Sequence, residues 1–225
     1  MSELKIIAHI YNDFEEKFGI PRQSGLANVR SRIVFEPLYR NADAFRGLDG
    51  FSHIWILWQF SKAVRDEWSP TVRPPRLGGN TRMGVFATRS PFRPNPIGLS
   101  SVKLCGIELN TPEGPVLYVE GADLLSGTPI YDIKPYLAYT DSHPQASEGF
   151  ALSQREGVLK VVVDKGVVLP EDKREEIIEL LAQDPRPQYQ SQPERTYTMA
   201  YGGYDVSFRT DGEILTVVGI RGSRQ

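Results

Sequence analysis

The segment His53-Ile54-Trp55-Ile56-Leu57-Trp58 decides the fold of this chain. It is short, apolar nearly throughout and rich in β-branched and aromatic residues, which favour a pleated and buried surface. A short apolar run of this kind is typical of a strand that is covered on both faces. We therefore predict that it is the central strand of the core.

Similar segments lie on both sides of it, with Gly and Pro residues between them as turns. We predict helix only at Ala42–Arg46 and Lys62–Glu67 in this part of the chain. Closely spaced strands with so few helices favour a closed sheet, so the first domain is expected to be mainly β, a small closed β-barrel. Its other predicted strands are Leu4–Tyr11, Ser31–Phe35, Met83–Thr88, Ile97–Glu108 and Val116–Gly121.

The apolar pattern fades between Ala138 and Gly157, which is typical of a linker or long surface loop. We therefore predict two domains, at residues 1–150 and 151–225. The second contains a helix with acidic residues in its first turn and a β-hairpin, and is expected to be a small α+β domain. Its predicted elements are the strand Leu159–Val163, the helix Pro170–Gln183, and the strands Tyr204–Arg209 and Ile214–Ile220.

The composition is that of an ordinary soluble protein, with 225 residues, 40% of them hydrophobic and 24% charged. No run approaches the ~20 apolar residues that span a bilayer, and no signal-peptide core is present. We expect a cytoplasmic protein without a membrane partner. The single cysteine, Cys105, excludes a disulfide framework within the chain and a multi-cysteine metal site, and the three histidines lack metal spacing, so no metal is expected.

The common enzymatic motifs are missing from the sequence. There is no nucleophile elbow and no phosphate loop of the Walker type. A Rossmann-type site for a dinucleotide or methyl donor needs closely spaced glycines, yet no Gly-x-Gly occurs in the chain. Hydrolase, metalloenzyme and Rossmann methyltransferase functions are therefore disfavoured.

Charge is distributed unevenly along the chain. The formal net charge is -2, but residues 69–106 contain six basic residues and no Asp or Glu, which leaves 20 basic against 28 acidic residues elsewhere. A local basic region of this kind favours an anionic partner. The alternative is that these side chains lie on several faces and pair with acids elsewhere in the chain. The six residues are Arg73, Arg76, Arg82, Arg89, Arg93 and Lys103.

Six of the 17 prolines lie between Pro70 and Pro96. Each proline restricts its backbone φ angle and removes a backbone donor. Stiff loops with exposed carbonyl groups are expected, and such loops hold arginines at low entropic cost. The alternative is that the Pro-rich connections only hold a barrel closed.

Within the string from Met83 to Ser100, the run Arg89-Ser90-Pro91-Phe92-Arg93-Pro94-Asn95-Pro96-Ile97-Gly98 closely resembles the signature of the TsaA/TrmO family of tRNA adenine-N6 methyltransferases. The resemblance covers roughly residues 1 to 140, and it extends more loosely into the second domain, where it is similar to the longer bacterial members. Further matching segments are 21–26, 44–48, 51–55, 124–129, 132–136 and 182–187 together with Tyr189.

The resemblance implies a small β-barrel methyltransferase that forms a homodimer and binds S-adenosylmethionine near the subunit interface. It implies a tRNA acceptor, an adenosine on the 3′ side of the anticodon that carries a threonylcarbamoyl group on N6. Where relatives have His-Gln, this chain has Ser61-Lys62, so only a backbone contact with the donor is carried over there. The other implied donor contacts are Pro21, Arg22, Gln23, Arg89, Leu99, Leu125, Ser126, Gly127 and Thr128.

The residue types at these positions suit the ligand and the reaction. Arg22 or Arg89 can grip the donor carboxylate with two hydrogen bonds. Methyl transfer to nitrogen needs the amine held in line and its proton accepted. We expect Asn95, with the carbonyls around Pro94 and Pro96, to orient the amine, and Asp132 or Tyr136 to accept the proton. The alternative for Asn95 is a turn residue that shapes the Pro-Asn-Pro bend.

We expect tRNA to contact the basic loops and the second domain, where Tyr189 can stack on an unpaired base. Two other functions stay open from the sequence. One is a tRNA- or nucleotide-binding module without methyl transfer, and the other is a methyltransferase with a protein or small-molecule acceptor. The expected RNA-binding residues are Arg73, Arg76, Arg82, Arg93, Arg186 and Tyr189.

Overall fold

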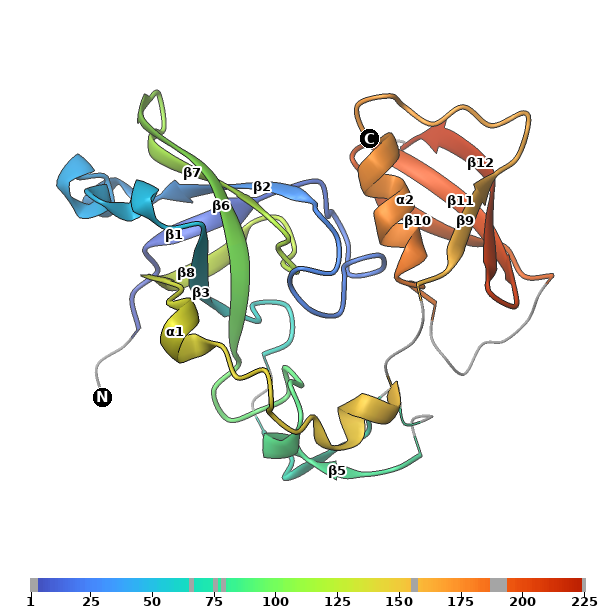
Figure 1. Ribbon diagram of the computed structural model, residues 1–225, viewed down its shortest axis with the longest axis horizontal. Coiled ribbons are helices and arrows are strands. Elements are labelled where there is room, and N and C mark those ends of the chain that lie inside the picture. The colour runs from blue at the N-terminus through green and yellow to red at the C-terminus, as the bar shows by residue number, and fades with distance from the viewer. Residues whose placement is uncertain are drawn as a thin grey trace.

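The computed structural model describes residues 4–64, 67–74, 77, 80–154, 158–186 and 194–223. Six antiparallel strands close into a barrel in the order β1-β2-β7-β6-β3-β8 (Figure 1). This arrangement confirms the expected closed β-barrel. Its strands are β1 (Ala8–Tyr11), β2 (Arg30–Phe35), β3 (His53–Gln59), β6 (Ile97–Thr111), β7 (Gly114–Glu120) and β8 (Thr128–Pro135).

Strand β3 alternates between the barrel interior and the outer face. Ile54, Ile56 and Trp58 are buried, whereas Trp55 and Leu57 are only partly buried. Successive side chains of a strand point to opposite faces, and on the outer face Trp55 contacts Tyr136 and Asp141 but stays only partly buried. The prediction that β3 is covered on both faces is therefore wrong.

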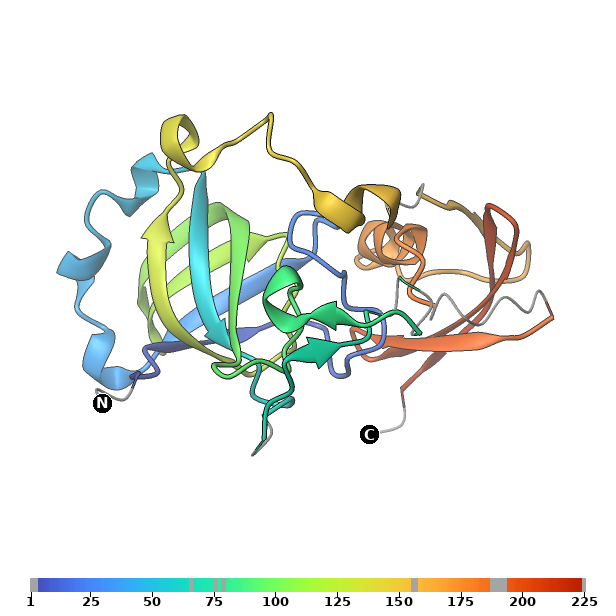
Figure 2. The ribbon, with the colours of Figure 1, turned by 90° about the horizontal axis from the view of Figure 1, so that it is seen from below.

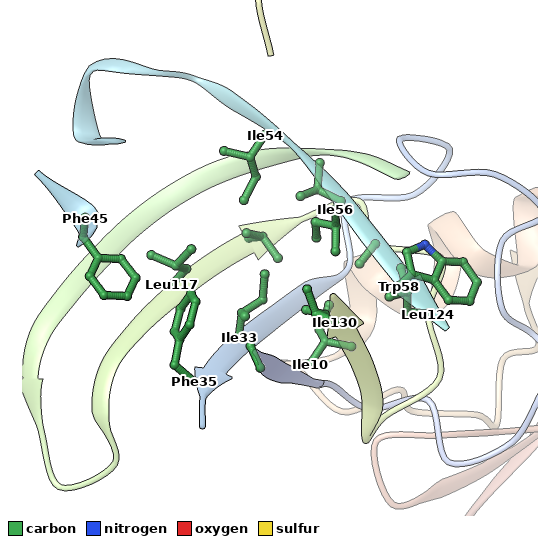
Figure 3. Close-up of a cluster of buried hydrophobic side chains, with 14 residues drawn as sticks. Ile10, Ile33, Phe35, Phe45, Ile54, Ile56, Trp58, Leu117, Leu124 and Ile130 are labelled. Carbon is green, nitrogen blue, oxygen red and sulfur yellow. The ribbon is translucent and has the colours of Figure 1, made fainter. Parts of the chain in front are cut away.

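The barrel core is filled from every strand (Figure 3). Phe35 and Phe45 meet edge to face at one end, with ring centroids 4.7 Å apart. Trp58 and Leu124 lie at the other end. The interior is thus packed with side chains and is not a channel.

Gly98 lets the large Trp58 ring fit inside the barrel. The two residues are paired across β3 and β6. A Cβ atom built on Gly98 would lie 2.2 Å from the Trp58 ring, a distance at which the ring or the strand must move. Glycine is the residue that permits this close approach of side chain to backbone.

A small ribbon lies outside the barrel (Figures 1 and 2). It consists of β4 (Thr71–Val72) and β5 (Met83–Gly84), followed by a 3-10 turn at Val85–Ala87. The strand expected at Met83–Thr88 is therefore shortened to its first two residues. The helix expected at Lys62–Glu67 is also wrong, since the described residues 62–64 and 67 form turns, a bend and irregular backbone.

Other element predictions need correction too. Leu4–Ile7 precedes β1 and is not part of it, and Ala42–Phe45 forms a 3-10 turn. Strand β8 was not predicted, because Pro129, Asp132 and Lys134 interrupt its apolar pattern. Its place between β1 and β3 depends on pairing with strands far away in the sequence.

The second domain is a four-stranded sheet in the order β10-β11-β12-β9, with only β12 and β9 parallel. The helix α2 packs against it through Ile177, Leu180 and Leu181. These elements confirm the expected α+β domain. They are β9 (Lys160–Val163), α2 (Arg174–Ala182), β10 (Tyr197–Tyr201), β11 (Tyr204–Asp211) and β12 (Ile214–Gly222), while α1 (Ala138–Asp141) and a 3-10 turn at Gly149–Gln154 lie in the connection.

The two domains share one hydrophobic cluster. Phe14, Ala27 and Val29 come from the segment between β1 and β2, and they are buried among residues of the second sheet and α2. The Phe14 ring lies 5.3 Å from that of Tyr201. A chain that ends near residue 150 would expose these three apolar side chains, so the barrel in this structure is not an independent unit.

Polar contacts accompany this shared cluster. Lys173 pairs with Asp13 of the first domain, and the Tyr201 hydroxyl donates to Glu176 over 2.9 Å. Burial raises the pKa of Tyr201, with the nearby Glu176 charge adding to the effect, so the phenol remains a hydrogen-bond donor. Within the described part of the chain, no helix has the length and apolar character needed to cross a membrane.

We expect Gly98→Ala to lower the free energy of unfolding by about 1 to 3 kcal/mol, because the added methyl group overpacks the buried Trp58 ring. Gly106→Ala on the same strand is the matched control, since its nearest neighbour would be a Tyr118 ring atom at 3.9 Å. Urea denaturation measures both variants. Equal midpoints for the two would contradict this account of Gly98.

Candidate functional site

Two loops that are distant in the sequence meet at one end of the barrel. Arg89, before β6, donates a hydrogen bond from Nη1 to Oε1 of Gln23, which lies between β1 and β2. Gln23 in turn donates to the Arg22 carbonyl. The structure therefore brings the Pro21–Gln23 segment and Arg89 together, as the candidate donor site requires.

A buried polar chain lies beside this contact. The indole N–H of Trp58 donates to Ser100 Oγ over 3.0 Å, and the Ser100 hydroxyl donates to Asp123 Oδ1 over 2.5 Å. Burial raises the pKa of Asp123, while the Ser100 hydrogen bond and the Arg89 charge limit the rise. Asp123 is thus a partly desolvated acid whose charged form is favoured by the Ser100 hydrogen bond and by the Arg89 charge.

Asp123 was not among the residues expected from the sequence. It directly precedes the apolar pair Leu124-Leu125, and an acid next to two leucines in a buried segment is a signal that could have identified it. A carboxylate with a perturbed pKa beside an arginine in a candidate site is typical of functional machinery. We therefore add Asp123 to the candidate site.

The loop 125–128 is pinned to the first domain by backbone hydrogen bonds. Ser126 N–H donates to the Phe14 carbonyl over 3.0 Å, and Gly127 N–H donates to the Ile10 carbonyl over 2.7 Å. The Thr128 hydroxyl donates to the Leu125 carbonyl over 2.6 Å. Gly127 is exposed, has a φ of 79° and has open space around it, so a ligand can approach the backbone there.

The Pro-rich loop before β6 is held by its own side chains. Ser90 N–H donates to Thr88 Oγ1, and Phe92 N–H donates to Ser90 Oγ, each over 3.2 Å. Arg93 donates to the Thr88 carbonyl over 3.1 Å. Its guanidinium therefore supports the loop from within, and an RNA contact from Arg93 would have to coexist with this bond.

Asn95 lies exposed at the end of this stiff loop. Its carbonyl accepts from Ile97 N–H over 2.7 Å, and the Pro96 carbonyl accepts from Phe60 N–H over 2.9 Å. No hydrogen bond of the Asn95 side chain is found among the residues that the structure describes. Its amide is therefore available to a ligand, whereas the Pro96 carbonyl already has one partner.

The catalytic candidates Asp132 and Tyr136, and the donor-contact candidate Leu99, lie elsewhere on the barrel. Leu99 and Asp132 flank Leu57 on the outer face, with Leu99 55% exposed and Asp132 paired to Lys134 over 2.9 Å. Tyr136 lies beyond the opposite end of β3 from Asn95 and bonds to the backbone there. Because β3 alone spans roughly 20 Å at 3.3 Å per residue, a single chain does not bring Asn95 and Tyr136 together.

The remaining donor candidates face the neighbouring loops. Lys62 presents its carbonyl to Lys17 Nζ at 3.1 Å, and Ser61 next to it is exposed. The Arg22 guanidinium donates to the Arg186 carbonyl over 3.2 Å, which directs it toward the second domain. The Arg22 guanidinium is thus joined to the second domain, whereas the Arg89 guanidinium contacts Gln23 of the first domain.

The candidate RNA-binding residues separate into two groups. Arg73 and Arg82 are exposed beyond the paired residues Val72 and Met83 of the ribbon. The Arg186 side chain is only 15% exposed and forms two hydrogen bonds of 2.8 Å with Asp184. A phosphate contact from Arg186 would have to open this pair or share the guanidinium with it, and the role expected for Arg186 stays a prediction. Arg76 and Tyr189 lie outside the described residues.

Comparison with known proteins gives a consistent result. Residues 9–142 match the family model described as tRNA-methyltransferase O N-terminal domain, and residues 168–223 match TrmO C-terminal domain. The chain is 43% identical over 212 residues to the tRNA (adenine(37)-N6)-methyltransferase of Escherichia coli (strain K12), with 90% of each chain covered.

Two proteins of Pseudomonas aeruginosa are also similar to this chain. One, named a putative S-adenosylmethionine-dependent methyltransferase, is 41% identical over 210 residues. The match covers 89% of this chain and 89% of that protein. The other is a solved structure described as TrmO, 31% identical, with a TM-score of 0.79 over 99% of this chain and 100% of that chain.

We expect Ser100→Ala to destabilise the fold by about 1 to 3 kcal/mol, since it leaves the buried Trp58 N–H without its acceptor. The raised pKa of Asp123 means that folding stability falls as the pH rises through the range between its ordinary and its raised pKa. Loss of the Ser100 donor raises this pKa further. The stability that Ser100→Ala loses relative to the unaltered chain is therefore expected to be larger at neutral pH than below the Asp123 pKa.

Ser101→Ala is the matched control, because Ser101 lies opposite Trp55 on the outer face. Thermal unfolding followed by circular dichroism at neutral and acidic pH measures both variants. The hydrogen-bonded chain Trp58–Ser100–Asp123 is contradicted if Ser100→Ala loses no more folding stability than Ser101→Ala, or if its loss of stability grows as the pH falls.

Proposed function

Because this chain belongs to the tRNA-methyltransferase O family, and is therefore a tRNA methyltransferase, we propose that it transfers the methyl group of S-adenosylmethionine to N6 of adenosine 37. We further propose that the acceptor already carries a threonylcarbamoyl group on N6. The observation that carries the proposal is the match over both domains, and the contact between Arg89 and Gln23, with the Arg89 charge acting on Asp123, supports it.

The donor site is proposed at the end of the barrel where these residues meet. S-adenosylmethionine supplies an electrophilic methyl group on a sulfonium, together with a carboxylate that suits a bidentate arginine. Arg89 would hold the carboxylate, with Gln23 and Asp123 fixing its orientation. The exposed Gly127 backbone and the chain around Pro21, Ser61-Lys62, Leu99 and Leu125–Thr128 would surround the rest of the donor.

The chain's own groups would then orient the acceptor. A nitrogen that bears a carbamoyl group is a poor nucleophile, because its lone pair is delocalised into the carbonyl group and the ring. Asn95 and the Pro94 carbonyl would hold N6 in line with the methyl group, and a carboxylate such as Asp132 would take its proton. Tyr136 could contribute only from a second subunit.

A homodimer is part of this proposal. Leu99 exposes 55% of its surface on the outer face of β6, next to the partly buried Leu57. A second subunit on this face would cover Leu99 and place another chain beside the donor site. Sedimentation equilibrium of the purified protein measures this, and a monomer at micromolar concentration would remove the dimer from the proposal.

The electrostatics of the ribbon support an RNA substrate. Arg73 and Arg82 directly follow and precede the paired residues Val72 and Met83, so they lie opposite one another. Like charges at such positions repel, and the described residues give neither an ion pair with an acid. A polyanion would relieve this repulsion.

Methyl transfer itself is the direct test. Purified protein is incubated with S-adenosylmethionine and tRNA that carries or lacks the threonylcarbamoyl group, and the nucleosides are analysed by mass spectrometry. We expect one added methyl group on the modified adenosine. No methylation of either tRNA would favour the alternative of a binding module, and transfer only to the unmodified tRNA would remove the threonylcarbamoyl part of the proposal.

Arg89→Ala is expected to weaken S-adenosylmethionine binding by about 1.5 to 3 kcal/mol, because a charge-assisted hydrogen bond is lost.

Asn95→Ala is expected to keep donor affinity while turnover falls roughly ten-fold or more, since an orienting group acts mainly in the transition state. Isothermal titration and methylation kinetics measure the two effects. Arg46→Ala is the control for Arg89→Ala, because Arg46 is an exposed arginine outside the candidate site. If Asn95→Ala lowered donor affinity and turnover equally, Asn95 would be a structural turn residue.

Phosphate contacts release counterions, so Arg73→Ala and Arg82→Ala should each reduce the slope of log tRNA affinity against log salt by about 0.7 to 0.9. Donor affinity should change little with salt. Arg186→Ala should leave the slope intact and lower the melting temperature, because its guanidinium is paired with Asp184. A flattened slope in Arg186→Ala would place that residue in the RNA interface.

A further inference from the structure

Two large aromatic rings are stacked on the surface at the base of the β4–β5 ribbon. Trp68 precedes β4 and is 52% exposed, and Phe86 follows β5 and is 72% exposed. Their ring centroids are 6.1 Å apart and their planes are inclined by 30°. The pairs Phe35–Phe45 and Phe14–Tyr201, in contrast, lie inside the hydrophobic clusters.

The backbone of the ribbon holds this pair in place. Thr71 pairs with Gly84, and Val85 N–H donates to the Pro70 carbonyl over 2.9 Å. The same register places Trp68 and Phe86 at one end of the ribbon and the two arginines at the other. The ribbon therefore presents an apolar aromatic surface and two cations that have no ion-pair partner within the described part of the chain.

This combination suits single-stranded nucleic acid better than another protein surface. Unpaired bases stack on exposed aromatic rings, and arginines nearby take the adjacent phosphates. A second copy of this chain is a poor occupant, because a two-fold contact brings the same surface of both copies to the interface, and that surface offers two arginines and, among the described residues of the ribbon, no acidic counterpart for them.

We propose that the Trp68–Phe86 pair is a stacking platform for an unpaired base of the tRNA anticodon loop, with Arg73 and Arg82 contacting neighbouring phosphates. The inference rests on the proposed function, since it takes tRNA as the substrate. It assigns to two residues outside the donor site the task of holding the loop while adenosine 37 is methylated.

The test uses the full chain and a synthetic anticodon stem–loop RNA as the probe. Phe86→Leu removes the ring and keeps an apolar side chain, and we expect it to weaken stem–loop binding in fluorescence anisotropy by about 5- to 100-fold. Binding to a fully paired RNA duplex should change little, and the salt slope should not change. Phe86→Trp should retain affinity. Tyr139→Leu, which alters an 88% exposed aromatic on α1, is the matched control.

Tryptophan fluorescence gives a second measurement on the unaltered chain. Of the three tryptophans, Trp58 is buried and the partly buried Trp55 donates its indole N–H to Asp141, so Trp68 is the most exposed. We expect the stem–loop to quench Trp68 emission and to protect it from acrylamide. Because this measurement uses the unaltered protein, it does not depend on whether the Phe86 variants fold.

Unchanged stem–loop affinity in a folded Phe86→Leu variant, or a Trp68 that stays open to acrylamide in the complex, would overturn the platform. A loss of dimer mass in Phe86→Leu with unchanged RNA affinity would assign the pair to a subunit contact and would also overturn it. Methylation by the unaltered chain is measured in parallel. If that fails, the proposed function fails; if it succeeds while Phe86→Leu binds normally, only the platform fails.

Discussion

The fit of the Trp58 ring against Gly98 is the constraint on which the rest of the structure depends. Glycine at this position lets a large indole fill one end of the barrel, and the indole N–H then needs a buried acceptor. Ser100, two residues further along the same strand, provides it and passes the hydrogen bond on to Asp123. Core packing is therefore connected by one chain of contacts to Asp123, a carboxyl whose pKa burial raises and the nearby Arg89 charge lowers.

The second domain supports this site without containing it. Phe14, Ala27 and Val29 are buried against the second sheet and α2, so the segment between β1 and β2, which also holds Gln23, is fixed from the side of the second domain. Arg22 reaches across to the Arg186 carbonyl. Arg186 itself is paired with Asp184, so the loop that carries Arg186 is held by an ion pair and is joined to the loop that carries Arg22 by a hydrogen bond.

The basic stretch is not a uniform electrostatic patch. Arg93 bonds to its own loop and Arg89 contacts Gln23, whereas Arg73 and Arg82 extend into solvent from the ribbon. The basic residues of this stretch therefore have different surroundings: one supports its own loop, one contacts a distant loop and two are exposed on the ribbon. The alternative that these basic residues pair with acids elsewhere in the chain holds for Lys103, which pairs with Glu120.

The sequence by itself determined the mainly β barrel, the α+β second domain and the loop segments that meet at Arg89, because β-branched runs, turn residues and a long signature are local properties. Tertiary structure alone decided that β8 closes the barrel, that β3 is buried on one face, and that Asp123 accepts a hydrogen bond from Ser100. It also decided that Arg186 is paired and that Trp68 stacks on Phe86. Each of these depends on which distant residues become neighbours when the sheet closes, and neither propensity nor periodicity along the chain contains that information.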